Sequence, residues 1–85
     1  MRLIWSENAW ADYLYWQTND KKMMKRINLL IKEIKRSPFE GTGKPEPLKH
    51  NWVGYWSRRV SQTDRLVYKV TDEAVFIAQA RFHYK

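Results

Sequence analysis

Residues 65–84, RLVYKVTDEAVFIAQARFHY, decide the fold of this 85-residue chain. Apolar and polar side chains alternate on both sides of residues 71–73, which is typical of two antiparallel strands joined by a tight turn. If these three residues form the loop, Val70 pairs with Ala74. The same register pairs Tyr68 with Phe76 and Leu66 with Ala78. The hairpin then runs to Tyr84 and holds the last residues of the chain as part of a central strand.

Alternation also assigns the hairpin side chains to two faces. One face is expected to be apolar and to pack against helices. Its members are Leu66, Tyr68, Val70, Phe76, Ala78, Ala80 and Phe82. The other face is expected to be polar. Its members are Arg65, Val67, Lys69, Ile77, Gln79, Arg81 and His83.

The first part of the chain predicts a strand and two helices. Residues 2–5, RLIW, form a short strand, and Ser6 can cap a helix that starts at Glu7. Asp20 can cap a second helix over 21–36. The apolar residues expected to face the core are Trp10, Tyr13 and Leu14 in the first helix and Met24, Ile27, Leu30, Ile31 and Ile34 in the second.

Residues 38–51 contain three prolines and two of the three glycines, so they are expected to form a loop. A strand over 55–60 follows. Trp56 and Val60 favour the core, which places Arg58 with them and Arg59 on the polar face. A simple count across the turn 61–64 predicts the reverse. We adopt Arg59 on the polar face, which needs a bulge or an odd-length loop.

The order βααβββ indicates an α+β domain that spans residues 1–85. We expect a two-helix hairpin packed on one face of a twisted, mainly antiparallel sheet. The chain carries 16 Lys and Arg against nine Asp and Glu, a net charge of +7, which favours a polyanionic partner. It has no cysteine, so disulfides and Cys-based zinc sites are excluded. No signal-peptide core or membrane-spanning run is visible, and we expect a cytoplasmic protein without a membrane partner.

Glu46 is the acid with the most unusual setting. Pro45 and Pro47 restrict its backbone, so its carboxylate is presented rigidly. If residues 45–50 fold back across the sheet, Glu46 meets Arg65 and His83. A carboxylate, an imidazole and a guanidinium suffice for RNA cleavage by general acid–base chemistry. Acidic and histidine residues do not stand paired at metal-ligand spacing, which argues against two-metal nuclease chemistry.

Each of these residues also has an ordinary explanation. Glu46 can be an exposed loop acid, and His83 a solvated residue near the end of the chain. Arg65 and Arg81 can be surface cations of a strand. His50 can serve as the acid in place of His83, although the sequence places no partner beside it.

The motifs PFEGTGKPEPLKHN, WSRR, RLVY and the terminal HY, together with LIWSENAWADYLYWQ, resemble YoeB-type toxins of the RelE superfamily. The resemblance covers essentially the whole chain. It implies a RelE-like fold and a ribonuclease of a type II toxin–antitoxin pair, which cuts mRNA in the A site of the 70S ribosome. It also implies homodimers and neutralisation by an acidic YefM-type antitoxin in a hetero-oligomer. Operator DNA would be bound only through that complex.

The resemblance assigns roles to six residues and implies no metal or organic cofactor. It implies that Glu46 is the general base, His83 the general acid and Arg65 the cation that stabilises the phosphate. Tyr84 helps to position the RNA, and Lys49 and Arg59 match basic residues that line the site. From its place on the polar face of the hairpin, Arg81 is also expected to bind RNA. Lys85 departs from the family, in which Tyr84 is often the last residue; activity is expected to survive because both preceding side chains are unaltered.

Two other functions remain open from the sequence. A non-catalytic RNA- or ribosome-binding module would need the basic surface but not Glu46. A co-repressor that acts on promoter DNA through its antitoxin is compatible with the enzyme.

Overall fold

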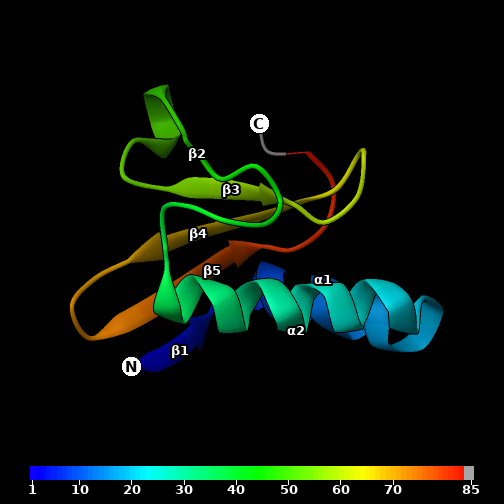
Figure 1. Cartoon of the computed structure of the whole chain (residues 1–85). Helices are drawn as coiled ribbons and strands as arrows, with labels where there is room; N and C mark the ends of the chain where they lie inside the picture. The colour runs from blue at the N-terminus through cyan, green and yellow to red at the C-terminus, as the bar shows by residue number, and fades with distance from the viewer. Residues whose placement is uncertain (84–85) are drawn as a thin grey trace.

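The computed structural model describes residues 1–83 and shows one five-stranded sheet with two helices on one side (Figure 1). The strands lie in the order β1-β5-β4-β3-β2; β1 is parallel to β5 and the other pairs are antiparallel. The predicted α+β architecture is therefore confirmed, with one parallel edge. The elements are β1 (Arg2–Trp5), α1 (Glu7–Asn19), α2 (Lys21–Arg36), β2 (Glu46–Pro47), the 3₁₀ turn η1 (His50–Trp52), β3 (Trp56–Arg59), β4 (Arg65–Val70) and β5 (Ala74–Gln79).

The two helices begin at the predicted capping residues. The Ser6 hydroxyl accepts a hydrogen bond from the Ala9 amide, and the Asp20 carboxylate accepts from the amides of Lys22 and Met23. The apolar stripe of α2 is buried as expected. No helix within residues 1–83 is long and apolar enough to cross a membrane.

The prediction for the buried face of α1 was wrong for Trp10 and Leu14, whereas Tyr13 packs partly buried against the core as expected. Trp10 is 47% exposed and Leu14 40% exposed, whereas Asp12 and Trp16 are buried. Trp10 and Tyr13 instead stack with their rings 5.7 Å apart, over Trp5. The apolar pattern misleads here because Asp12 and Trp16 are needed inside to hold backbone groups at the end of β5.

The hairpin register differs from the predicted one by one residue at the turn. Val70 pairs with Val75, because Thr71 closes a four-residue turn in which its amide donates to the Ala74 carbonyl. A bulge then adds a second residue to the shift: Tyr68 pairs with Ile77 but Val67 with Gln79, which leaves Ala78 as the extra residue. The predicted core residues Phe76 and Ala78 are replaced by Val75 and Ile77. Beyond the bulge, Leu66 and Ala80 occupy the core as predicted.

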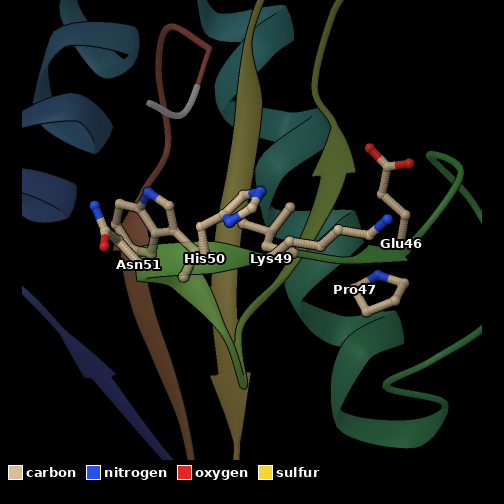
Figure 2. Close-up of a pocket in the computed structure, with 7 residues that line it drawn as sticks. Glu46, Pro47, Lys49, His50 and Asn51 are labelled. Carbon is tan, nitrogen blue, oxygen red and sulfur yellow. The ribbon is translucent and has the colours of Figure 1, made fainter.

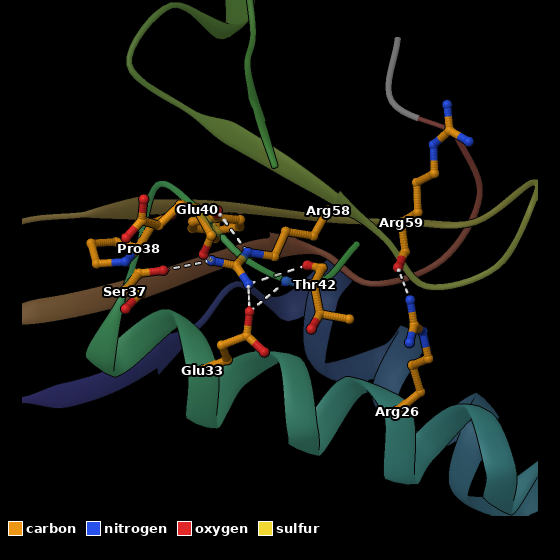
Figure 3. Close-up of polar contacts among 9 residues, drawn as sticks. Arg26, Glu33, Ser37, Pro38, Glu40, Thr42, Arg58 and Arg59 are labelled. Atoms are coloured by element: carbon orange, nitrogen blue, oxygen red, sulfur yellow. Dashed lines mark hydrogen bonds and ion pairs between the residues drawn. The ribbon is translucent and has the colours of Figure 1, made fainter. Parts of the chain in front are cut away.

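Strand β3 shows the predicted alternation. Arg58 is fully buried on the helix side, opposite Leu66, and Arg59 is exposed on the other side, opposite Arg65. Figure 3 shows the two side chains pointing in opposite directions, Arg58 toward α2 and Arg59 away from it. From α2, Arg26 donates hydrogen bonds to the carbonyls of Arg59 and Val60, which fixes the end of β3.

Arg58 joins α2, β4 and the loop after α2 (Figure 3). Its guanidinium pairs with Glu33 at 2.8 Å and its Nε donates to the Tyr68 hydroxyl, which in turn donates to the Pro38 carbonyl. Further donors reach the carbonyls of Ser37, Glu40 and Thr42. Hydrogen bonds from the Thr42 amide and hydroxyl, and then from Arg58, lower the pKa of Glu33. A buried cation with this many acceptors is stabilised only as a complete network.

We therefore expect Arg58→Met to lower the free energy of unfolding by about 3 kcal/mol or more, because it leaves buried acceptors unpaired. Arg59→Met is the matched control on the exposed side and should change it by less than about 0.5 kcal/mol. Urea denaturation followed by circular dichroism measures both. Equal losses for the two variants would contradict the role given to Arg58.

Candidate active site

The sheet face opposite the helices, here called the open face, carries the site. Glu46 pairs with Ser57, Ser57 with Val67, and Val67 with Gln79, so these four residues form one row across β2, β3, β4 and β5. Because Arg58 and Tyr68 mark the helix side, this row lies on the open face. Arg59 and Arg65 form the neighbouring row on the same face.

Glu46 lies at one end of a pocket of about 380 Å³. Figure 2 shows the row of side chains that follows it, with Lys49 extending along the pocket and Asn51 at the far end. His50 lines the same pocket, so the structure brings this histidine near Glu46 although the sequence gave it no partner. The complete lining is Glu46, Pro47, Leu48, Lys49, His50, Asn51 and Trp52.

The chain leaves the sheet after Gln79, so the prediction of a strand running to Tyr84 was wrong for residues 80–83. Side chains of α1 take the hydrogen bonds that a neighbouring strand would have made. The Ala80 amide donates to the Asp12 carboxylate at 3.0 Å, and the Trp16 indole donates to the Ala80 carbonyl at 2.8 Å. Burial raises the pKa of Asp12, partly offset by its bond to Ala80 and by the charge of Arg81.

Asp64 holds the next residue of this tail. Its Oδ1 accepts a 2.7 Å hydrogen bond from the amide of Phe82, whose backbone has a left-handed φ of 64°. The Phe82 carbonyl accepts from the Arg65 amide and from the Gln79 side chain. The tail is thereby tied to the start of β4 through Phe82, the residue before His83.

Arg65 is buried, and its Nη1 donates to three loop carbonyls, those of Ser61, Gln62 and Asp64. The loop before β4 therefore fixes the position of the guanidinium. The other oxygen of the Asp64 carboxylate accepts from the hydroxyls of Ser61 and Thr63 and so stabilises the same loop. Asp64 thus organises both the loop that holds the Arg65 side chain and the backbone of Phe82.

The placement of Arg81 was predicted wrongly. Its guanidinium lies 3.3 Å from the ring centre of Tyr15 and 4.3 Å from that of Phe82, against α1 and not beside Arg65. The bulge and the early end of β5 change the alternation on which the prediction depended. Arg81 therefore secures the tail through cation–π contacts.

His83 is exposed and lines a second pocket, together with Trp52 and Gln79. Trp52 belongs to both pockets, so the surface is continuous from Glu46 to His83. Tyr84 lies outside the described residues. Within residues 1–83, no three acidic, histidine or cysteine side chains gather at a spacing that could hold a metal ion.

The sequence predicted Glu46, Arg65 and His83 as site residues, and these assignments stay predictions. It missed two residues that hold the loop and the tail around them: Asp64 stood only within the turn 61–64, and Asp12 was given no role. The sequence did contain a signal for these two residues, because an acidic residue stands in each of the two elements next to the end of the hairpin. Asp12 lies in α1, and Asp64 lies in the turn before β4. Their hydrogen bonds depend on where β5 stops, which the alternation pattern did not reveal.

The fold and the site define a small basic α+β domain whose open sheet face carries a carboxylate, a guanidinium and an imidazole. Residues 5–84 match the family model of the YoeB-like toxin of bacterial type II toxin–antitoxin systems. The chain belongs to this family. It is 62% identical over 84 residues to Toxin YoeB of Escherichia coli K12, covering 99% of this chain and all of that protein.

Solved structures agree with this assignment. A YoeB/ParE toxin from Agrobacterium tumefaciens superposes with a TM-score of 0.96 at 48% identity, over 99% of this chain and all of the other. A toxin from Staphylococcus aureus is described both as a YoeB dimer and as a heterotetrameric YoeB–YefM complex. Each is 49% identical and covers 99% of this chain and 98% of the other, with TM-scores of 0.93 and 0.91.

Removing the Asp64 carboxylate should loosen the tail, because Phe82 loses the acceptor for its amide. We expect Asp64→Ala to speed hydrogen exchange of the Phe82 amide by about tenfold, and Asp64→Asn to keep most of the protection because its Oδ1 can still accept. Exchange measured by NMR tests this. Unchanged protection of Phe82 in Asp64→Ala would contradict the contact.

Asp12 should make stability fall as pH rises. Its pKa is higher in the folded protein than in the unfolded chain, so the folded state binds more protons between about pH 4 and the raised pKa. Asp12→Asn keeps an acceptor for Ala80 without the buried charge. The Tm of this variant relative to wild type should therefore increase from pH 4 upward and then level off. A difference that is constant with pH would contradict the burial of a charged Asp12.

Proposed function

We propose that this protein is a metal-independent endoribonuclease that cleaves mRNA in the A site of the ribosome and stops translation. The observation that supports the proposal is the strand register, in which Glu46 and Arg65 belong to the same face of the sheet, together with the hydrogen bond from the Arg65 amide to the Phe82 carbonyl, the residue before His83. The net charge of +7 supports RNA as the substrate, because cations attract the phosphate backbone. Membership of the YoeB-like toxin family supports the ribosome as its place of action.

The chemistry assigned to the site is attack of the RNA 2′-hydroxyl on the adjacent phosphorus. Glu46 accepts the hydroxyl proton as general base, the O2′–P bond forms and the P–O5′ bond breaks. His83 donates a proton to the leaving 5′-oxygen. Arg65, held by three carbonyls, stabilises the charge that grows on the phosphoryl oxygens. The products are a 2′,3′-cyclic phosphate and a 5′-hydroxyl, and DNA is not cleaved because it lacks the nucleophile.

The basic residues of the open face would bind the RNA backbone. Lys49 lines the Glu46 pocket, and Arg59 lies exposed next to Arg65. Arg81 is assigned to the tail instead, because its guanidinium is held between Tyr15 and Phe82. Tyr84 keeps the role implied by the family resemblance, that of positioning the RNA.

The proposed partners follow from the family and its solved complexes. A YefM-type antitoxin would neutralise this chain in a hetero-oligomer, and two copies of the chain would form a homodimer. Operator DNA would be reached only through the antitoxin complex. A protein that acts on mRNA in translating ribosomes would work in the cytoplasm.

The experiment is cleavage of a defined mRNA on initiated 70S ribosomes, with 5′ ends mapped by primer extension. We expect wild type to cut inside the A-site codon and Glu46→Gln to slow cutting by at least about 100-fold while preserving ribosome binding. Glu73→Gln, an exposed acid in the β4–β5 turn, is the matched control and should cut normally.

A non-catalytic binding module would give the opposite pattern. It would bind ribosomes and leave the mRNA intact, and Glu46→Gln would add only a small electrostatic gain. Full cleavage by Glu46→Gln would overturn the role of Glu46, and cleavage that persists in His83→Gln would overturn that of His83.

A further inference from the structure

The second pocket, beside His83, has a composition unlike the first. It measures about 390 Å³ and is lined by Asn8, Trp52, Gln79, Phe82 and His83. Within the described part of the chain, its lining contains two aromatic rings and two amides but no lysine or arginine. The Glu46 pocket, in contrast, contains Lys49. The two pockets meet at Trp52.

The ring of Phe82 lies at the surface, and both its exposure and its backbone conformation are unfavourable in free energy. The side chain is 59% exposed, and its backbone adopts a left-handed φ that residues other than glycine rarely use. Asp64 holds the Phe82 amide, and the Arg81 guanidinium lies 4.3 Å from the ring centre. Residues held in a rare backbone conformation by surrounding contacts cluster at functional sites and ligand clamps.

Trp52, the second aromatic ring of this pocket, and the Gln79 amide are also held by neighbouring groups. Trp52 lies in η1, with its ring nearly perpendicular to that of Tyr55 at 5.2 Å. The Gln79 amide nitrogen donates to the carbonyls of Arg81 and Phe82, which sets the orientation of that amide. Asn8, in the first turn of α1, completes the lining. Rigid aromatic rings with oriented amides suit a flat heterocycle that has donors and acceptors on its edge.

We propose that the pocket formed by Asn8, Trp52, Gln79, Phe82 and His83, the base pocket, binds the nucleobase of a nucleotide next to the cleaved phosphate. This inference rests on the proposed function, since it takes RNA as the substrate and the region between Glu46 and His83 as the place of the reacting phosphate. A base fits the pocket better than a phosphate does, because aromatic faces bind bases and the lining lacks fixed cations. Holding one base would align the 2′-hydroxyl with the leaving oxygen.

The test uses a five-nucleotide RNA with a 2′-deoxy group at the central, reactive nucleotide, so that the full chain binds it without cutting. An abasic site is placed at each other position in turn, and Kd is measured by fluorescence anisotropy at low salt. We expect one position next to the central phosphate to weaken binding on the order of tenfold, and the remaining positions to have smaller effects.

Variants of Trp52 connect that penalty to the base pocket. Trp52→Leu should weaken binding of the intact RNA by a similar factor. In this variant the abasic site should cause no further loss of affinity. Trp52→Phe keeps a ring and should retain most of both effects. Trp10→Leu, which changes an exposed tryptophan outside the pocket, is the matched control and should bind like wild type.

The outcomes separate the two proposals. Three results would overturn the base pocket: equal Kd values for all abasic RNAs, a loss of affinity at one abasic position that persists in Trp52→Leu, or no binding of any RNA. Cleavage by wild type on ribosomes would still support the proposed enzyme in each case. A position-specific penalty removed by Trp52→Leu, without any cleavage by wild type, would support the base pocket and overturn the proposed enzyme.

Discussion

One buried guanidinium, that of Arg58, fixes which side of the sheet faces the helices. Its N–H groups donate to Glu33 in α2, to carbonyls of the loop after α2 and to the Tyr68 hydroxyl at once. Strand β3 must therefore turn the Arg58 side toward the core. Alternation then sends Ser57 and Arg59 to the open face, and the pairing of Glu46 with Ser57 brings the carboxylate there too. A cation in the core thus determines on which face of the sheet Glu46 and Arg59 lie.

The second constraint is the way the chain leaves β5. A strand ending would ordinarily release the last residues, which fray unless something holds them. Here α1 holds both polar groups of Ala80 through Asp12 and Trp16, and Asp64 holds the amide of Phe82. Burial of the Asp12 carboxylate raises its pKa, and this desolvation is part of the free-energy cost of anchoring the tail. The candidate site therefore draws on three separate segments: the proline-restricted loop contributes Glu46, the central strand β4 contributes Arg65 and the anchored tail contributes His83.

Much of this was readable from the sequence. The caps at Ser6 and Asp20, the stripe of α2 and the opposite directions of Arg58 and Arg59 follow from local patterns whose physical causes are short-range. The register of the hairpin did not follow, because the four-residue turn and the bulge at Ala78 each shift it by one residue, and a total shift of two leaves the alternation of faces beyond the bulge unchanged. The path of Arg81 depends on that bulge and on the rings of Tyr15 and Phe82, which are far apart in sequence. The sequence offered candidate site residues, whereas the groups that hold the loop and the tail around them depend on tertiary contacts.

The open face carries the Glu46 carboxylate and the Arg65 guanidinium, and the tail carries His83 at the edge of an aromatic pocket. The function that we propose for these residues makes one chemical claim, that the 2′-hydroxyl of the RNA is the nucleophile. The most direct test replaces a single nucleotide of the A-site codon by its 2′-deoxy counterpart in mRNA on programmed ribosomes. Substitution of the nucleotide on the 5′ side of the cut should abolish cleavage at that bond, while the same change one codon upstream should leave it intact. Cleavage that continues at the substituted bond would contradict the mechanism, because the attacking oxygen would have to come from elsewhere.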